Sequence, residues 1–385
     1  MKLEKKAYKF IRDCCIVLFA FSAVLVLMTI AFNLSFMNPV AQTMKDFSLS
    51  DIYYYVLRDH GRVDSCRMIT IVDMTALQSR GDIADGIEAI ESMNPKAVGV
   101  DIVFEGTKPD TLGDMRLMEV ATKYQNLVFS YRLSDYANDS VGYTREEHSF
   151  FADVIPVKEG FTNFQRSLYG GVKRKVSLKG LCKGEERHSL VYEVAQLYSD
   201  GAITLSNGDV LNVNFKPTGF RQIPYDSVVY HRDWIEGQIV LYGATHELYD
   251  THYTPLGEMA GVELQAYAAQ TLLAHTDVKH PAGWVTAILS FILVFITFKG
   301  RTCYVEWAKA RKNEWLSFFL TTTFVIGFLL LLWTGFLAYL GFLLFVWTGI
   351  CLNLGWMMAA IPFLGGAGEF FGLTIRNWFG EFRTF

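Results

Sequence analysis

The sequence lacks most of the patterns that mark an enzyme or a nucleic-acid-binding protein. Six cysteines occur in 385 residues, and none has the spacing of a zinc site. The formal net charge is −4 and the basic residues are scattered, so no nucleic-acid-binding surface is indicated. No serine lies in a nucleophile-elbow context, and no glycine-rich phosphate loop precedes a helix. We therefore expect no enzymatic activity, no cofactor and no nucleic-acid partner.

Long apolar runs are present instead, and they predict a membrane protein. Residues 14–32 contain a nearly uncharged run of about 18 residues, just long enough to cross a bilayer. A secretory signal peptide is the competing interpretation, but residues 33–37 do not resemble a small-residue cleavage site, so an uncleaved anchor is favoured. Further spans are predicted at 281–298, 315–334 and 336–358, with the last two joined by a tight turn at Thr334–Gly335 or near Tyr339–Gly341.

Basic residues predict the orientation of these spans. Residues 1–13 carry five lysines and arginines, and the connection at 299–314 carries another group, whereas the turn after the third span carries none. Because positively charged loops stay in the cytoplasm, both termini are expected inside and residues 33–280 outside. Residues 359–385 then form a cytoplasmic tail.

The external segment shows the alternation of strands and helices that is typical of an α/β domain. Apolar runs at Met68–Asp73 and Ala97–Phe104 enclose a helical pattern that Asp82 caps and Asn94–Pro95 ends, which predicts a βαβ unit. The predicted fold class is α/β, a mainly parallel sheet with flanking helices, plus a four-helix transmembrane region. The other expected elements are helices at 46–60, 111–124, 188–200 and 262–275, strands at 126–133, 210–215 and 238–244, a hairpin around Tyr169–Gly171, a turn at 206–209 and an irregular excursion at 134–157.

Only two of the six cysteines, Cys66 and Cys182, fall within the external segment. An oxidising compartment would allow them to form a disulfide bond. Two buried free thiols are the alternative, because a sequence does not show whether two Cα atoms approach each other.

Three aspartates are the main candidates for a binding site. Asp73 and Asp101 are predicted at the carboxyl ends of neighbouring parallel strands, and Asp250 follows the strand at 238–244 by a short loop. Ligands of open α/β sheets bind at this edge, so the three carboxylates are candidates for gripping a polar ligand or a divalent cation. The alternative is that each aspartate caps its own loop.

The loop around Asp250 adds weaker candidates. His246, Glu247 and His252 have side chains that could join a metal site with the aspartates, although surface residues without a shared role are the simpler interpretation. Thr254 could contact a ligand, or it could shape the turn before Gly257.

The tail has apolar residues at helical spacing. Phe371, Ile375, Trp378 and Phe382 fall on one face, which predicts an interfacial amphipathic helix or a docking segment for a separate cytoplasmic partner.

The segments Ile-Thr-Ile-Val-Asp73, Ala-Val-Gly-Val-Asp-Ile-Val-Phe104, Gly-Gln-Ile-Val-Leu-Tyr-Gly-Ala244 and Asp-Thr-His-Tyr-Thr-Pro-Leu-Gly257 occur in this order. Together with Gly-Val-Glu-Leu-Gln-Ala-Tyr-Ala-Ala-Gln270, they resemble the type-two CHASE domain, a bacterial extracellular sensor module, over residues 45–277. The resemblance implies an inner-membrane protein with one span before the domain and three after it. Met74 and residues 78–82 depart from the acidic residue and tryptophan-rich turn of the family.

Two functions are consistent with these features. Family members usually carry a cytoplasmic output domain, and the residues after Met358 are too few to form one. The favoured hypothesis is therefore a non-catalytic membrane subunit whose external domain mediates assembly or signalling with other membrane proteins. The alternative is a stand-alone sensor of a small ligand or cation that signals to a separate cytoplasmic partner.

Overall fold

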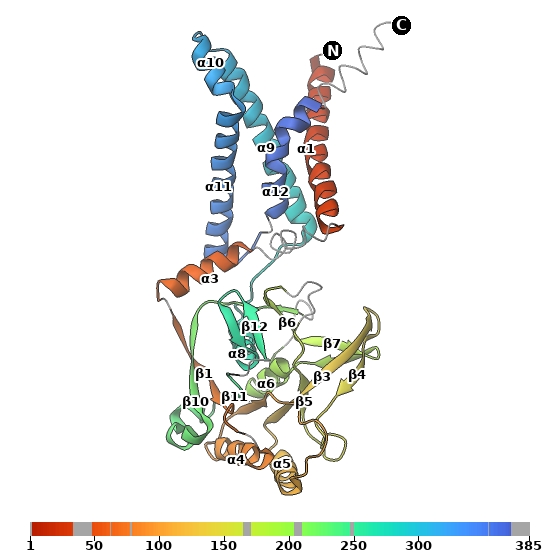
Figure 1. Ribbon diagram of the computed structural model, residues 1–385, viewed down its shortest axis with the longest axis vertical. Helices are drawn as coiled ribbons and strands as arrows, with labels where there is room; N and C mark the ends of the chain where they lie inside the picture. Colours follow the sequence, from red (N-terminus) through yellow and green to blue (C-terminus); the bar gives the residue numbers. More distant parts are fainter. Residues whose placement is uncertain are drawn as a thin grey trace. The chain divides into compact units, whose positions relative to one another are not determined.

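The computed structural model of the chain describes residues 2–33, 48–61, 63–77, 79–164, 171–203, 210–246, 250–352 and 354–370. Two compact units are present (Figure 1). Residues 51–278 form one, called here the sheet domain. Residues 1–50 and 279–385 contribute to the other, called here the helical unit. Helix α3 (Leu49–Asp59) contains the division between them.

The sheet domain contains a nine-stranded sheet with the order β10-β1-β11-β2-β3-β4-β7-β8, and β5 also pairs with β3. Six pairings are parallel, namely β1 with β10, β1 with β11, β11 with β2, β2 with β3, β3 with β5 and β4 with β7. The predicted mainly parallel sheet is thus confirmed. The strands of this sheet are β1 (Asp64–Asp73), β2 (Ala97–Val100), β3 (Leu127–Asn138), β4 (Gly142–Glu147), β5 (Glu159–Phe161), β7 (Lys179–Cys182), β8 (Glu185–His188), β10 (Thr218–Pro224) and β11 (Ile239–Gly243).

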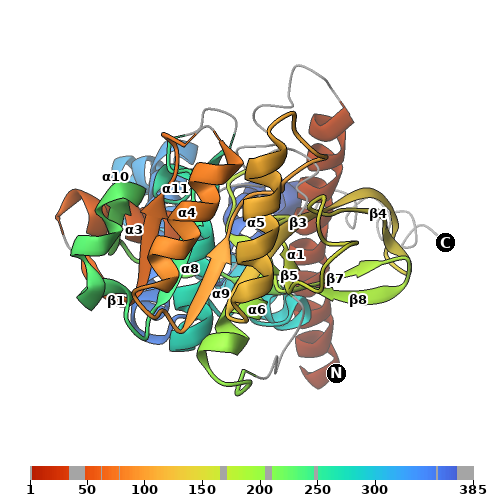
Figure 2. The ribbon, with the colours of Figure 1, turned by 90° about the horizontal axis from the view of Figure 1, so that it is seen from below.

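Helices cover both faces of this sheet, because its central strands are apolar on both sides. Val98 and Val100 of β2 pack in the same buried cluster as Ile87 of α4 and Leu117 of α5. On the other face, a Cβ atom on Gly99 would meet Val194 of α6. Figure 2 shows α4 and α5 lying side by side along the strands. The remaining helices are α4 (Arg80–Glu91), α5 (Thr111–Lys123), α6 (Leu190–Tyr198), η2 (Tyr225–Tyr230), α7 (Arg232–Ile235) and α8 (Gly261–Ala274).

Helix α4 begins differently from the prediction. Ser79, rather than Asp82, is its N-cap, and the Ser79 hydroxyl accepts a hydrogen bond of 3.1 Å from the Asp82 N–H. The carboxylate of Asp82 in turn accepts a 2.6 Å hydrogen bond from the Ser79 hydroxyl. The Ser79 side chain therefore satisfies one of the free backbone donors of the first turn, and the Asp82 carboxylate orients its hydroxyl.

The strand order corrects one expectation about the candidate site. Strand β11 lies between β1 and β2, so the strands that end near Asp73 and Asp101 are not neighbours. Residues 134–157 also differ from the predicted irregular excursion, because β3 extends to Asn138 and pairs antiparallel with β4. Two small antiparallel pairs complete the domain, β6 (Lys175–Ser177) with β9 (Val210–Asn212) and β12 (Thr251–Thr254) with β13 (Gly257–Ala260).

Several expectations concern residues outside the described ranges. The predicted hairpin turn at Tyr169–Gly171 falls largely within residues 165–170, the turn at 206–209 within 204–209, and Glu247 within 247–249. The tail residues lie there too, namely Phe371, Ile375, Trp378 and Phe382. The two cysteines of the sheet domain are described: Cys66 and Cys182 are both buried free thiols, not a disulfide, and burial raises the pKa of each.

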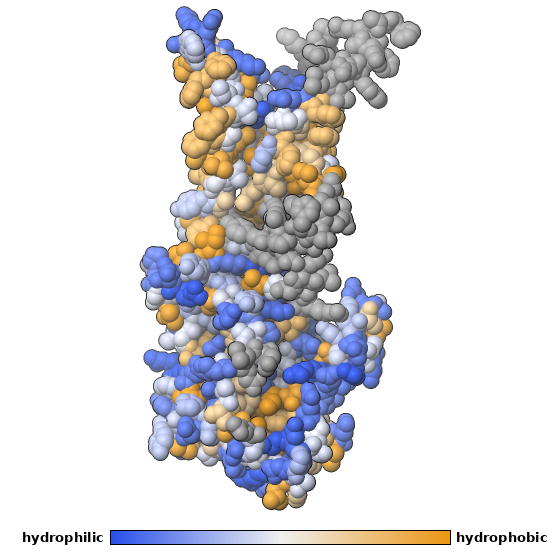
Figure 3. Space-filling model, viewed as in Figure 1, coloured by the Kyte–Doolittle hydropathy of each residue, from blue (hydrophilic) through white to orange (hydrophobic). Residues whose placement is uncertain are grey.

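The helical unit has three helices long and apolar enough to cross a membrane, within the part of the chain that is described. These are residues Lys6–Leu27 of α1 (Lys2–Asn33), α9 (Gly283–Lys309) and α11 (Thr323–Thr348). Figure 3 shows apolar side chains over α9 and α11, bordered by hydrophilic residues where α9 meets α10. The shorter helices of the unit are α10 (Glu314–Thr321), α12 (Gly355–Ala360) and η3 (Ile361–Phe363).

The predicted hairpin of a third and a fourth span is wrong, because α11 runs without a break through Thr334 and Gly335. The Thr334 hydroxyl donates to the carbonyl of Leu330, four residues earlier, so this side chain is accommodated within the helix (2.8 Å). The helix ends only at Gly349, whose φ of 69° is the left-handed conformation that glycine adopts readily. Backbone hydrogen bonds join Lys279 to Gly349 and Cys351, so the start of α9 lies beside the end of α11.

An ion pair with a buried carboxylate joins α1 to α9. The Asp13 side chain is fully buried, and its carboxylate accepts hydrogen bonds from the ammonium group of Lys299 and the guanidinium group of Arg12. Apolar side chains of α1, α9, α12 and η3 form a common core around the same helices, including Val17, Val294, Met357 and Ile361.

Candidate functional site

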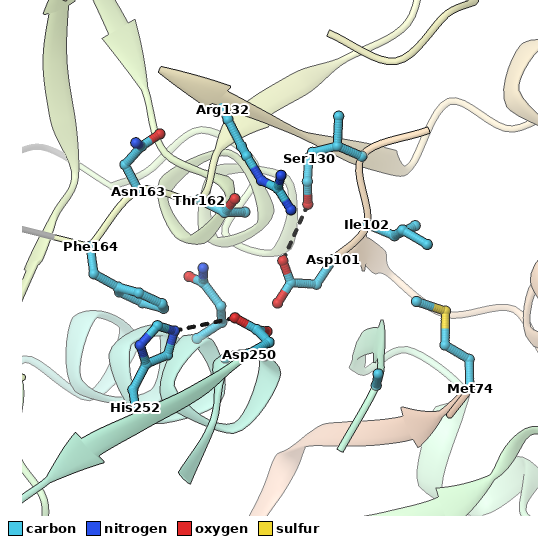
Figure 4. A pocket seen from close by; sticks show the side chains of 14 residues that line it. Met74, Asp101, Ile102, Ser130, Arg132, Thr162, Asn163, Phe164, Asp250 and His252 are labelled. Atoms are coloured by element: carbon cyan, nitrogen blue, oxygen red, sulfur yellow. Dashed lines mark hydrogen bonds and ion pairs between the residues drawn. The ribbon is translucent and has the colours of Figure 1, made fainter. Parts of the chain in front are cut away.

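A cavity of about 380 Å³ opens in the sheet domain where its parallel strands end. Met74 follows β1, Asp101 follows β2 and Ala244 follows β11, so three successive strands of the sheet deliver residues to it. Strand β3, the segment after β5, the loop before β12 and helix α8 form the other walls (Figure 4). The volume lies in the range of small-molecule sites, and the position is where open α/β sheets bind ligands.

Asp101 is the central acidic residue of this cavity. Its backbone N–H donates to the carbonyl of Tyr242 (2.8 Å), which fixes the residue at the end of the sheet. The hydroxyl of Ser130 donates to the carbonyl of Val100 (2.6 Å) and lies 3.4 Å from the Asp101 carboxylate. Burial, together with the negative charge of Asp250, raises the pKa of Asp101 to about 7. Near neutral pH this carboxyl group can therefore either donate or accept a proton.

Asp250 and His252 form a pair on the opposite wall (Figure 4). His252 Nε2 lies 3.3 Å from Asp250 Oδ1, and the exposed fractions of the two side chains are 23% and 49%. The ring of Phe164 packs edge-on against that of His252, with centroids 4.5 Å apart. A Cβ atom on Gly261 would come within 2.3 Å of Asp250 Oδ2, so the absence of a side chain at the start of α8 leaves room for this carboxylate.

The cavity also presents donors. Arg132 of β3 lies near the carboxyl group of Asp101, and its positive charge acts to lower the pKa of Asp101, although burial outweighs it. Gln265 of α8 is buried and brings an amide group to the lining. The amide of Asn163 is already used by β3, because it donates to the Leu133 carbonyl and accepts from the Leu133 N–H, each at 2.7 Å.

Asp73 does not line the cavity, and its carboxylate instead links two loops. It accepts hydrogen bonds from the N–H (3.0 Å) and hydroxyl (2.5 Å) of Thr75 and from the N–H of Thr245 (3.1 Å). Burial acts to raise the pKa of Asp73, but these three donors outweigh it and lower that pKa. Asp73 therefore holds the loop after β1 against the loop after β11.

The remaining candidates lie around the cavity rather than in it. The Thr254 hydroxyl donates to the Gly257 carbonyl (2.8 Å) and accepts from the Leu256 N–H (3.2 Å), so it shapes the turn between β12 and β13. His246 is exposed, and its Nδ1 lies 3.7 Å from Asp73 Oδ2. No group of three His, Cys, Asp or Glu side chains arranged to hold a metal ion occurs among the described residues.

Sequence reasoning identified Asp101, Asp250 and His252 but missed their neighbours. Ser130 and Arg132 sit on a strand whose alternating pattern gave no sign of a site. Gln265 offered a usable signal, because it is a polar residue on the face of α8 that otherwise carries Val262, Ala266 and Ala269. A buried amide on such a face requires a partner or a ligand.

Comparison with known proteins accounts for this architecture. A family model described as the CHASE2 domain matches residues 23–299, which is more than half of the chain and extends from α1 into α9. No curated protein and no solved structure matches the chain. The CHASE2 domain is an extracellular sensory domain. The chain belongs to the CHASE2 domain family.

Proposed function

We propose that this protein is a membrane-anchored sensor that binds a small polar molecule in the cavity of its sheet domain. The observation that carries this proposal is the meeting of Asp101, Asp250, Arg132 and Gln265 at the ends of the parallel strands. A ligand that suits this lining has a hydrogen-bond donor or a positive group for the two carboxylates and an acceptor for Arg132 and Gln265. A bound cation would satisfy only the two carboxylates and would leave Arg132 and Gln265 without an acceptor.

Helix α8 supports a signalling role for the cavity. Gly261 and Gln265 in its first turns line the cavity, and the chain reaches membrane helix α9 only eight residues after α8 ends at Ala274. A ligand that binds two positions of α8 unequally would shift the population between them. The position of α9, and through it a separate cytoplasmic protein, would then report on ligand binding.

The test uses the full chain purified in mild detergent. Its thermal unfolding is followed while small amines, amino acids, hydroxylated acids and single divalent cations are added one at a time. A ligand of the folded state raises the melting temperature by an amount that grows with the logarithm of one plus the ratio of free ligand concentration to Kd. We expect at least one polar compound to do so, and Asp101→Asn and Gln265→Leu to abolish the effect.

Asp153→Asn is the matched control, because Asp153 is an exposed aspartate of the same domain that does not line the cavity. The control variant should respond to the ligand as the unmodified chain does. Equal responses from Asp101→Asn, Gln265→Leu and the control would show that the cavity is not the binding site.

Assembly with other membrane proteins is the second candidate function. Its support is α11, which buries only Leu337, Gly341 and Phe345 in the helical unit and leaves large apolar side chains such as Phe324, Leu331 and Trp347 uncovered. Either lipid or partner helices can cover such a surface. Membrane proteins that co-purify with the chain at a fixed stoichiometry would favour assembly over a lone sensor.

The orientation that we propose places the sheet domain outside the cytoplasm and the basic segment at 299–314 inside, in a bacterial inner membrane. The antiparallel course of α9 and α11 supports this arrangement, because the start of α9 and the end of α11 are bonded to each other. Reporter fusions at Asp135, Asn313 and Gly349 test it. We expect Asp135 and Gly349 on the outer side and Asn313 on the cytoplasmic side, and a reporter at Asn313 on the same side as Asp135 would contradict the proposal.

A further inference from the structure

Arg301 occupies an unusual place in membrane helix α9. It follows Gly283, the first residue of the helix, by 18 positions, which is about 27 Å at 1.5 Å per residue and close to the thickness of the hydrocarbon layer. Tyr304 and Trp307 follow it in the same helix, and aromatic residues of this kind are typical of the membrane–water interface. This distance from the helix start corresponds to the depth of lipid headgroups in a bilayer that α9 crosses.

An apolar groove borders Arg301 on one side of α9. It has a volume of about 310 Å³ and is lined by Ile296, Gly300 and Tyr304 of α9 and by Ile326, Leu329 and Trp333 of α11. The indole N–H of Trp333 donates to the Thr297 hydroxyl (2.9 Å) at one end, and the Tyr304 hydroxyl donates to the Leu320 carbonyl (3.2 Å) at the other. These bonds link α9 to α11 at one end of the groove and to α10 at the other.

A second cavity borders the same arginine on the other side. It has a volume of about 240 Å³, and Arg12, Thr302, Gly365 and Glu369 line it together with Arg301. A Cβ atom on Gly365 would lie 3.2 Å from Arg301 Nη2, so the guanidinium group rests against a residue without a side chain. Arg301 is the residue that the two cavities share.

The charges of this region are not balanced. The carboxylate of Asp13 pairs with both Lys299 and Arg12. Among the described residues, no carboxylate forms an ion pair with Arg301, and its buried Nε atom has no hydrogen-bond partner. The exposed carboxylate of Glu369 lines the second cavity but does not pair with Arg301. A positive group at headgroup depth beside an apolar groove is complementary to a molecule with a phosphate and a long hydrocarbon chain.

We infer that this region binds one anionic glycerophospholipid of the leaflet that faces the 299–314 loop. Its phosphate contacts the guanidinium group of Arg301 in the cavity that Arg12 and Thr302 complete. One acyl chain lies in the groove between α9 and α11, against Gly300 and Leu329. The inference concerns the helical unit alone and is independent of a ligand in the sheet domain.

The test compares two lipids that differ only in the headgroup. The full chain is purified in mild detergent, stripped of lipid, and mixed with phosphatidylglycerol or phosphatidylcholine that carry identical acyl chains. Native mass spectrometry counts bound lipids, and thermal unfolding reports their effect on stability. We expect one tightly bound phosphatidylglycerol, a higher melting temperature with it than with phosphatidylcholine, and no comparable effect of inorganic phosphate alone.

Three variants locate the site. Arg301→Gln removes the charge and should weaken phosphatidylglycerol binding by about tenfold or more. Gly300→Leu should also displace the lipid, because no atom lies within 4 Å of a Cβ at this position and the new side chain would extend into the groove. Arg311→Gln is the matched control, since Arg311 belongs to the same basic segment and stacks on Trp307 outside both cavities.

Four results would overturn the inference. Equal binding of the two lipids would remove the role of the phosphate, and full binding by Arg301→Gln would remove the role of Arg301. A loss in Arg311→Gln as large as that in Arg301→Gln would indicate diffuse attraction to the basic segment. A polypeptide that crosslinks to a cysteine at position 300, in place of lipid, would show that the groove holds a partner helix.

Discussion

A buried carboxylate has opposite surroundings in the helical unit and in the sheet domain. In the helical unit, Asp13 is fully buried and accepts hydrogen bonds from Lys299 and Arg12, so its charge is neutralised where it lies. In the sheet domain, Asp101 has one long hydrogen bond from Ser130 and faces a second carboxylate, Asp250. A paired charge stabilises the fold, whereas an incompletely paired charge in a cavity remains available to a ligand.

Removal of Asp13 should give the largest effect of this comparison. Asp13→Ala leaves Lys299 and Arg12 without their partner, and because both cations are more than a third exposed we expect a cost of about 2–3 kcal/mol, less than for a fully buried pair. We expect a large fall in the melting temperature of the full chain in detergent. Lys6→Ala, in the exposed first turns of the same helix, should leave it unchanged. The exchange Asp13→Lys with Lys299→Asp should recover part of the loss, and no recovery would argue against the pair.

Crowding at the end of β11, beside Asp101, should have the next largest effect. A Cβ atom on Gly243 would lie 2.9 Å from Val262 and 3.2 Å from the Cβ of Asp101. Gly243→Ala is therefore expected to destabilise the sheet domain by about 1–3 kcal/mol, the usual cost of overpacking.

Circular dichroism during thermal unfolding measures this loss. Gly219→Ala is the control, because a Cβ atom there meets no atom closer than 3.5 Å. If both variants unfold at the same temperature, the strand ends are less tightly packed around Asp101 than the geometry requires.

The raised pKa of Asp101 predicts a pH dependence. The unfolded chain releases this proton near the ordinary pKa of 3.8, whereas the folded chain holds it until about pH 7. Stability therefore falls as the pH rises from about 4 to 7. Asp101→Asn removes this contribution, so the variant should match the original chain near pH 4 and exceed it at pH 8 by about 1–2 kcal/mol.

Melting temperatures between pH 4 and pH 8 test this expectation. Burial also raises the pKa of Glu91 to about 7, so the original chain and the variant share that contribution and their difference isolates Asp101. A constant difference across the whole range would mean that Asp101 does not titrate in this window.

Gly335 gives the smallest expected effect. It lies inside α11, and no atom lies within 4 Å of a Cβ at this position. Gly335→Ala should raise stability by about 0.5–1 kcal/mol, because alanine favours a helix interior over glycine. A tight turn at this position would give the opposite sign, so a small increase in the melting temperature supports the continuous helix and a decrease contradicts it.

The sequence allowed much of the fold to be predicted, because local patterns identify single elements. The unbroken apolar runs located β1, β2 and β11, and helical spacing located α5 and α8. The order in which the strands pair could not be predicted, because nothing in the residues of β11 indicates that it lies between β1 and β2. The turn within residues 315–358 was wrongly placed for a related reason. Threonine and glycine read as a turn in isolation, but in an apolar segment the helical backbone satisfies its own hydrogen bonds.

The candidate site could be predicted only in part. Asp101 and Asp250 could be predicted because each is a polar residue that follows an apolar strand, where the chain leaves the sheet. Asp73 has the same local setting, yet Thr75 and Thr245 occupy its carboxylate. The decisive neighbours are distant in the sequence, since Thr245 follows Asp73 by 172 residues and Asp250 lies far beyond Asp101, and no local pattern contains such contacts.

The central position of β11 has a consequence for how the domain is made. This strand is the bridge between β1 and β2, but it is synthesised about 140 residues after β2, once nearly the whole domain has emerged. Until then the first half of the sheet lacks its middle strand, and such non-local pairing is slow to form. The sheet therefore closes around its own centre only when β11 is available, and until then the facing edges of β1 and β2 have no partner strand.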